Sequence, residues 1–148
     1  MSSSHSLAVK YSSPKSKDIP AGSVSFDGSN GSMGSALSIV NIVMDDVSTA
    51  GSSWAVSPVA GDIIRIQSII DGAIATADAV ITPQINTVAI TGGAITIATA
   101  GSAAGDIDVS TPTALRTVAV GDAIEIATSG ASTNTVRANF TVTIQRSS

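Results

Sequence analysis

Few side chains in this chain of 148 residues could take part in acid–base or nucleophilic chemistry. His5 is the only histidine, and it lies in a serine-rich stretch where only another chain could position it as a general base. The chain has no cysteine, which excludes a thiol nucleophile and a thiolate metal site. Serines are abundant, but no Gly-x-Ser-x-Gly motif is followed by the acid and histidine of a catalytic triad. We therefore expect no catalytic residues and no enzymatic activity.

Carboxylates are the next candidates, as ligands for a hard cation such as calcium. Asp106 and Asp108 alternate along the chain, and Asp45 and Asp46 are adjacent. Neither pair lies in a complete Asp-rich calcium loop closed by a glutamate, so we interpret both pairs as solvated loop carboxylates. Three other aspartates neighbour a glycine, which predicts that they cap turns: Asp62, Asp71 and Asp122. We expect neither a metal nor a cofactor.

The elements that position these side chains are predicted to be strands. Apolar residues make up 43% of the chain and are mostly Ile, Val and Ala, which favour strands. Period-two alternation indicates three sets of inward-facing residues: Phe140, Val142 and Ile144; Ile64, Ile66 and Ile70; and Ile124 and Ile126. The segment 36–44 is also predicted to be a strand, although its apolar spacing would suit a short helix equally well.

Turn residues separate the predicted strands about every ten residues, a spacing typical of antiparallel sandwiches and barrels. Asn86 predicts one turn, and Thr91-Gly92-Gly93 predicts a hairpin turn. Pro83 places its strand at a sheet edge or at a bulge. We predict an all-β protein with an antiparallel, jelly-roll-like β-sandwich, and an immunoglobulin-like sandwich is the alternative.

Residues 1–35 differ in composition from the rest, because Ser, Gly, Pro and Lys dominate them. We predict an extended N-terminal arm over 1–35 and a β-sandwich body over 36–148. Residues 1–20 carry three lysines against Asp18 alone, whereas the remainder has a net charge of −6. No apolar signal-peptide core and no apolar run long enough to cross a bilayer occurs, so we expect neither secretion by that route nor a membrane span.

Only 12% of the residues are charged, which suggests that much of the surface is covered in use. Three lysines with Tyr11 as the single stacking ring fall short of a nucleic-acid platform, and the acidic body would repel DNA. We expect the lysines to meet an acidic surface of a partner protein. Phe26 lacks a local core and should bury itself in a partner or against the body. Trp54 should either pack in the core or anchor an interface.

A resemblance to a known family covers a little over half of the chain, from about Gly61 to Gln145. The segments IDGAIATADAVITPQI, VAITGGAITIATAGSAAGDID and GDAIEIATSGAS resemble the β-rich capsid decoration, or cement, proteins and related head-fibre domains of tailed bacteriophages. The resemblance implies a structural protein on the outer capsid surface of a virion, where it clamps neighbouring major capsid proteins and stabilises the shell. It implies a homotrimer in preference to a homodimer, and it brings no catalytic residues.

The contacts to the major capsid protein are assigned from the residues themselves, since the family offers no motif to transfer. We expect them in the arm, at Lys10, Tyr11, Lys15, Lys17 and Phe26. The alternative function is a carbohydrate-binding or host-adhesion β-sandwich on a virion surface. Such sites present several exposed aromatic rings, and this chain has few to offer.

Overall fold

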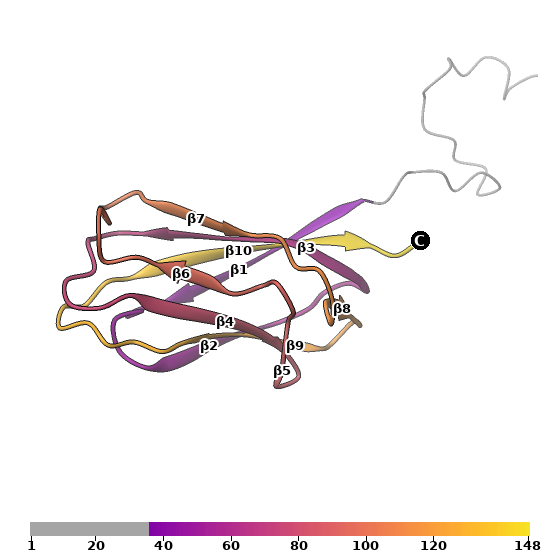
Figure 1. Ribbon diagram of the computed structural model, residues 1–148. Coiled ribbons are helices and arrows are strands. Elements are labelled where there is room, and N and C mark those ends of the chain that lie inside the picture. The colour runs from indigo at the N-terminus through magenta and orange to yellow at the C-terminus, as the bar shows by residue number, and fades with distance from the viewer. Residues whose placement is uncertain (1–35) are drawn as a thin grey trace, which may run out of the picture. The chain divides into compact units, whose positions relative to one another are not determined.

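The computed structural model describes residues 36–148, which form two antiparallel β-sheets packed face to face (Figure 1). The predicted arm, residues 1–35, lies outside the described residues. The all-β sandwich is confirmed. Residues 36–148 contain no helix, and hence no helix that could cross a membrane.

Each sheet has five strands, two of which are short segments at one edge. Sheet A contains β1 (Leu37–Met44), β10 (Ala138–Arg146), β3 (Gly61–Ile70), β7 (Ile107–Ser110) and β8 (Thr117–Val118). Sheet B contains β2 (Gly51–Val56), β9 (Ala123–Thr128), β4 (Ala79–Ile85), β5 (Val88–Ala89) and β6 (Ile95–Ile97). The segment 36–44 is thus a strand, as predicted, because β1 pairs with β10 along its whole length.

Early strands pair with late strands in a nested order. β1 pairs with β10, β2 with β9, β3 with β7 and β8, and β4 with β5 and β6. β10 also pairs with β3, and β9 with β4, so these two late strands lie inside their sheets. The outermost strands are β1 and β2 on one side, and the short segments on the other.

The core between the sheets is built mainly from isoleucine and valine. Phe140, at 0% exposure, is its largest fully buried side chain. The predicted inward faces of β10 and β9 are confirmed, because Val142 and Ile144 are buried with Phe140, and Ile124 and Ile126 are buried opposite them. Burying such side chains contributes about 1.5–3 kcal/mol each relative to exposure.

The predicted inward face of β3 is wrong at one position. Ile63, not Ile64, is fully buried, while Ile66 and Ile70 face inward as predicted. The register explains the change, because Thr143 opposes Arg65 whereas Ile144 opposes Ile63. Ile64 is therefore the extra residue of a β-bulge, which resets the alternation of side chains along the strand.

The hairpin predicted at Thr91-Gly92-Gly93 is also wrong. β5 and β6 both run antiparallel to β4 along the same edge, so they are two parts of one interrupted strand. The residues between them bulge outward without reversing the chain. Pro83 lies in an inner strand, opposite the gap between β5 and β6, where its missing N–H removes no ladder bond.

The turn at Asn86 is confirmed, since Asn86 and Thr87 both have the positive φ of a tight hairpin turn.

On one side of the sandwich, the segment between β5 and β6 is hydrogen-bonded to the segment between β7 and β8, which links the two sheets. The Thr91 N–H donates to the C=O of Ala114 (3.0 Å), and the Thr113 N–H donates to the C=O of Thr91 (2.8 Å). The Ser110 hydroxyl donates to the C=O of Gly93 (2.7 Å). These bonds connect the edge of sheet B to the edge of sheet A, which closes this side against strand addition.

Gly61 allows β3 to approach the end of β10. A Cβ at Gly61 would overlap the carbonyl oxygen of Gln145, whereas a Cβ at Gly51, the first residue of β2, would have no atom nearer than 3.8 Å. We predict that Gly61→Ala lowers the free energy of unfolding by about 1–3 kcal/mol, because the backbone of β10 must shift. Gly51→Ala, the matched control, should change it by less than about 0.5 kcal/mol. Urea denaturation of both variants measures the difference, and equal stabilities would contradict the close approach.

Candidate interaction surface

Two of the four aspartates that were interpreted as solvated loop carboxylates have hydrogen-bond partners, and a third, Asp108, lies in β7 and not in a loop. Asp46 accepts hydrogen bonds from the N–H of Ser48 (2.8 Å) and Val136 (3.2 Å) and from the Thr49 hydroxyl (2.8 Å). Asp106 accepts one from the N–H of Ala103 (2.9 Å). Within residues 36–148, no group of three or more His, Cys, Asp or Glu side chains could hold a metal ion.

The turn-capping prediction for three aspartates is right for one of them. Asp122 accepts from the N–H of Ala119 (2.7 Å) within its turn. Asp71 instead accepts from the N–H of Arg137 (2.9 Å), a distant residue in the sequence. Asp62 lies inside β3 and also binds across strands, as the next paragraph describes. The glycine next to each aspartate therefore did not predict which group would donate a hydrogen bond to its carboxylate.

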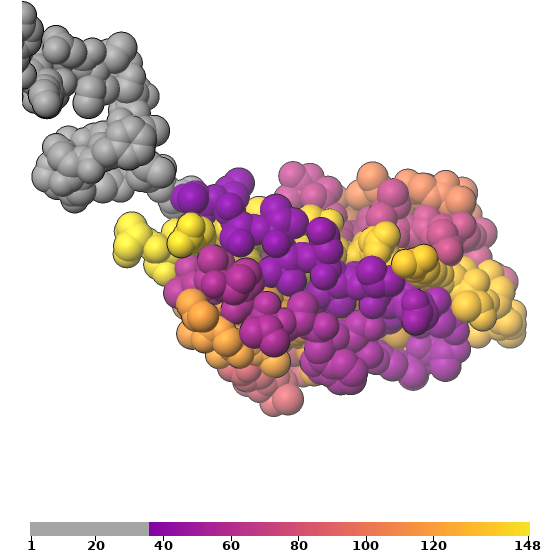
Figure 2. Space-filling view, turned by 180° about the vertical axis from the view of Figure 1, so that it is seen from behind, coloured from indigo at the N-terminus to yellow at the C-terminus, as the bar shows by residue number. Residues whose placement is uncertain are grey.

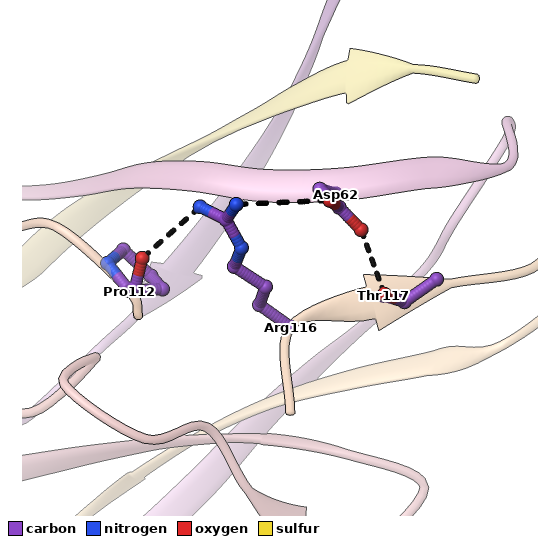
Figure 3. A network of polar contacts seen from close by, with 4 residues as sticks. All are labelled: Asp62, Pro112, Arg116 and Thr117. Carbon is purple, nitrogen blue, oxygen red and sulfur yellow. Dashed lines mark hydrogen bonds and ion pairs between the residues drawn. The ribbon is translucent and has the colours of Figure 1, made fainter. Parts of the chain in front are cut away.

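Asp62 and Arg116 fasten β8 to β3 (Figure 3). The Thr117 hydroxyl donates to Asp62 (2.7 Å), and the Arg116 guanidinium lies 3.7 Å from the same carboxylate. Arg116 also donates to the C=O of Pro112 (3.1 Å). This is the one ion pair among the described residues, and every partner in it holds a strand or a loop in place. It is a structural contact.

Trp54 is exposed on the outer face of β2, so its predicted alternative of packing in the core is wrong. Its side chain is 63% exposed and lies opposite Glu125 of β9. Successive side chains of a strand point to opposite faces, so Ala55 faces inward, opposite Ile124, and Trp54 faces the solvent. An interface role for Trp54 stays a prediction. The arm residues Lys10, Tyr11, Lys15, Lys17 and Phe26, together with His5, lie outside the described residues.

β1 and β2 present free edges on the same side of the sandwich. No strand within residues 36–148 pairs with either edge. The N–H of Arg146 donates to the C=O of Ala36 (2.9 Å), which puts the even-numbered residues of β1 in hydrogen-bonded pairs with β10. The N–H and C=O groups of its odd-numbered residues therefore point to the free edge. In β2 the N–H of Ser57 donates to the C=O of Asp122, which puts the odd-numbered residues in hydrogen-bonded pairs with β9. The N–H and C=O groups of the even-numbered residues of β2 therefore point to its free edge.

The side chains of these two edge strands carry no charge, and most of the exposed ones are apolar. We define the β1–β2 surface by its exposed apolar residues: Leu37, Ile39 and Val43 of β1, and Trp54 and Val56 of β2. The indigo and purple segments that carry them lie side by side in Figure 2. Natural edge strands are commonly protected by charges, prolines or bulges, and neither strand has one. This side is therefore suited to contact with another protein surface.

Sequence reasoning did not single out the apolar side chains of β1. The signal was present, because LSIVNIVM carries apolar residues on both of its faces. A strand that buries only one face needs polar residues on the other. The excess of apolar residues in 37–44 thus indicated a second, outward-facing contact.

A pocket of about 270 Å³ lies at one end of the outer face of sheet A. Its walls come from the end of β3, the start of β10 and the loop before β7: Ile69, Ile70, Asp71, Gly105, Arg137 and Asn139. Two more exposed apolar side chains, Ile107 and Val109, stand on the neighbouring β7. Pockets that enclose small-molecule ligands span about 300–1,000 Å³, so this one suits a single large side chain.

Charge is unevenly divided between the two sheets. All four arginines of residues 36–148 lie in sheet A or directly before one of its strands: Arg65, Arg116, Arg137 and Arg146. The strands of sheet B contain no basic residue, and their one charged side chain is Glu125. Sheet A and the residues directly beside its strands also carry four aspartates, so the charges there balance: Asp62, Asp71, Asp106 and Asp108. The strands of sheet B are left with the single negative charge of Glu125.

The pKa values of two aspartates move in opposite directions. Burial alone would raise the pKa of Asp46, but the hydrogen bonds from Thr49, Ser48 and Val136 outweigh it and lower the pKa below 3.8. Burial raises the pKa of Asp108, and the nearby charge of Asp106 raises it further. Ionised Asp46 therefore stabilises the fold, whereas ionised Asp108 opposes it.

We predict that Asp46→Asn destabilises and Asp108→Asn stabilises the protein at about pH 7. The contribution of Asp46 is present above its unfolded pKa of 3.8 and disappears as the pH falls through its lower folded pKa. The cost of Asp108 disappears as the pH falls through its raised folded pKa. Urea denaturation at about pH 7 and about pH 2.5 should show both differences shrinking at the lower pH. Equal effects at the two pH values would refute the electrostatic origin.

The chain was compared with known protein families and with curated proteins. No known protein family matches the chain, and no curated protein matches it. The function is therefore argued from the geometry of residues 36–148 and from the sequence.

Proposed function

We propose that this protein is a structural virion protein, a capsid decoration protein that binds the outer surface of a tailed-phage capsid. It clamps neighbouring major capsid proteins and stabilises the shell, as a homo-oligomer with three copies preferred over two. The observation that carries the proposal is the β1–β2 surface, where two uncharged free edges lie beside exposed apolar side chains. Such a surface fits permanent contact with neighbouring proteins.

The strand order supports the jelly-roll interpretation within the sandwich. A jelly roll is a rolled antiparallel ribbon in which the first strand pairs with the last, the second with the one before it, and so on inward. The pairs β1–β10, β2–β9, β3–β7/β8 and β4–β5/β6 follow that order. In an immunoglobulin-like sandwich the first strand pairs with the second, whereas β1 and β2 lie in different sheets here.

The position of Trp54 bears on the rival function of glycan binding. Among the described residues Trp54 is the one exposed aromatic side chain, since Phe140 is fully buried. Carbohydrate platforms use several convergent rings and polar groups. A single ring beside Val56 on an edge strand is better suited to a protein contact, which supports the assembly role.

We predict that deletion of residues 1–30 leaves the body folded and abolishes capsid binding. Residues 36–148 form a core cluster of buried side chains among themselves, so circular dichroism should still show a folded β protein. Binding is measured by co-sedimentation with empty shells of the major capsid protein. If the deletion variant binds the shells as well as the full chain does, the arm is not needed for binding and its proposed role is wrong.

Electrostatic steering is tested separately, by reversing Lys10, Lys15 and Lys17 to glutamate. We expect association with the shells to slow by about tenfold or more at low salt and to lose its dependence on ionic strength. Reversal of Arg146, a single charge on the body, serves as the control and should have a smaller effect. Unchanged rates in the triple variant would reject steering by the arm.

A further inference from the structure

Trp54 is placed as an anchor side chain without a partner. It is the only tryptophan in the chain, and it is 63% exposed on an edge strand, next to Val56 at 66%. Large aromatic side chains that protrude from a folded surface are the residues that most often dominate the binding energy of interfaces. Solvation of a bare indole is unfavourable, so its exposure points to a contact made by the assembled protein.

The pocket beside Ile69 offers a matching recess on the other sheet. Its volume of about 270 Å³ accepts one large side chain, with the exposed side chain of Ile69 as its apolar wall. The carboxylate of Asp71 and the amide of Asn139 stand at the same pocket. A buried indole N–H needs an acceptor, and either group supplies one.

An unpaired charge stands beside the anchor and another, of opposite sign, lines the pocket, where the carboxylate of Asp71 is already bound by the N–H of Arg137. Glu125 is the cross-strand neighbour of Trp54, and its carboxylate makes no hydrogen bond or ion pair within residues 36–148. Arg137 lines the pocket, and its guanidinium is likewise without a partner within those residues. The Arg137 N–H donates to the carboxylate of Asp71 (2.9 Å), and the Asp71 N–H donates to the C=O of Arg137 (3.0 Å), so the backbone of Arg137 is held at the pocket wall.

We propose that a second copy of this chain seats its Trp54 in this pocket, with its Glu125 facing Arg137. The indole then packs on Ile69 while the Arg137 guanidinium covers the ring and pairs with the carboxylate. Contact of like with like is disfavoured, because it would oppose Glu125 to Glu125 or Arg137 to Arg137. The joint is therefore made between unlike faces of two copies, and it is independent of any capsid.

The test uses the full chain and the emission of its single tryptophan. Over a concentration series, sedimentation velocity should show association, and the Trp54 emission maximum should shift to shorter wavelength in step with it. Arg137→Glu and Glu125→Arg should each weaken association by about tenfold or more and keep the emission at long wavelength. The double variant with both changes should restore association and the shift, because the pair is present with its signs exchanged.

Arg146→Glu is the matched control, since it makes the same charge change in β10 away from the pocket and should associate like the wild type. Arg137 and Glu125 are not core residues, and circular dichroism checks that each variant is folded. The proposal is overturned by a wild-type chain that stays monomeric, by association without an emission shift, or by a double variant that fails to recover. Capsid binding is read in a separate assay, so a protein that associates in this way without binding shells would refute the proposed function alone.

Discussion

The nested pairing of early with late strands is the constraint on which the rest of the structure depends. β10 lies between β1 and β3, and it brings Phe140, Val142 and Ile144 to the centre of the core. Sheet B is incomplete until β9 joins β2 to β4, and sheet A is incomplete until β10, near the end of the chain, joins β1 to β3. The entropy lost in closing such long loops must be offset by the apolar area that β9 and β10 bury.

The same nesting gives the sandwich two unlike sides. On one side, the insertions between β5 and β6 and between β7 and β8 meet through Thr91 and Ala114, and the sheets are joined there. On the other side lie β1 and β2, which are the outermost partners of the ribbon and have no strand beyond them within residues 36–148. Backbone groups of Thr91, Thr113 and Ala114 are bonded between the sheets on the first side, whereas those at the outer edges of β1 and β2 remain available on the second.

Several carboxylates of the body hold its fold together. Asp46, Asp62 and Asp71 each bind groups from distant parts of the chain and hold loops against strands. Arg137 and Glu125 stand apart from this pattern, because each is left with an unused charge beside an apolar feature of the surface. Unused charges of opposite sign on opposite sheets are a physical reason for copies to meet in one orientation.

The sequence by itself determined the all-β class, the inward faces of β9 and β10, the turn at Asn86 and the scarcity of catalytic groups. These follow from local alternation and turn chemistry, which neighbouring residues decide. Only the tertiary structure decided that Ile63 replaces Ile64 in the core, that Thr91-Gly92-Gly93 does not reverse the chain, and that Trp54 faces solvent. The places of Ile63 and Trp54 depend on the register against β10 and β9, far away in the sequence, where a shift of one residue exchanges the two faces. The course of the chain at Thr91 depends on its bonds to Thr113 and Ala114 of the other sheet's edge.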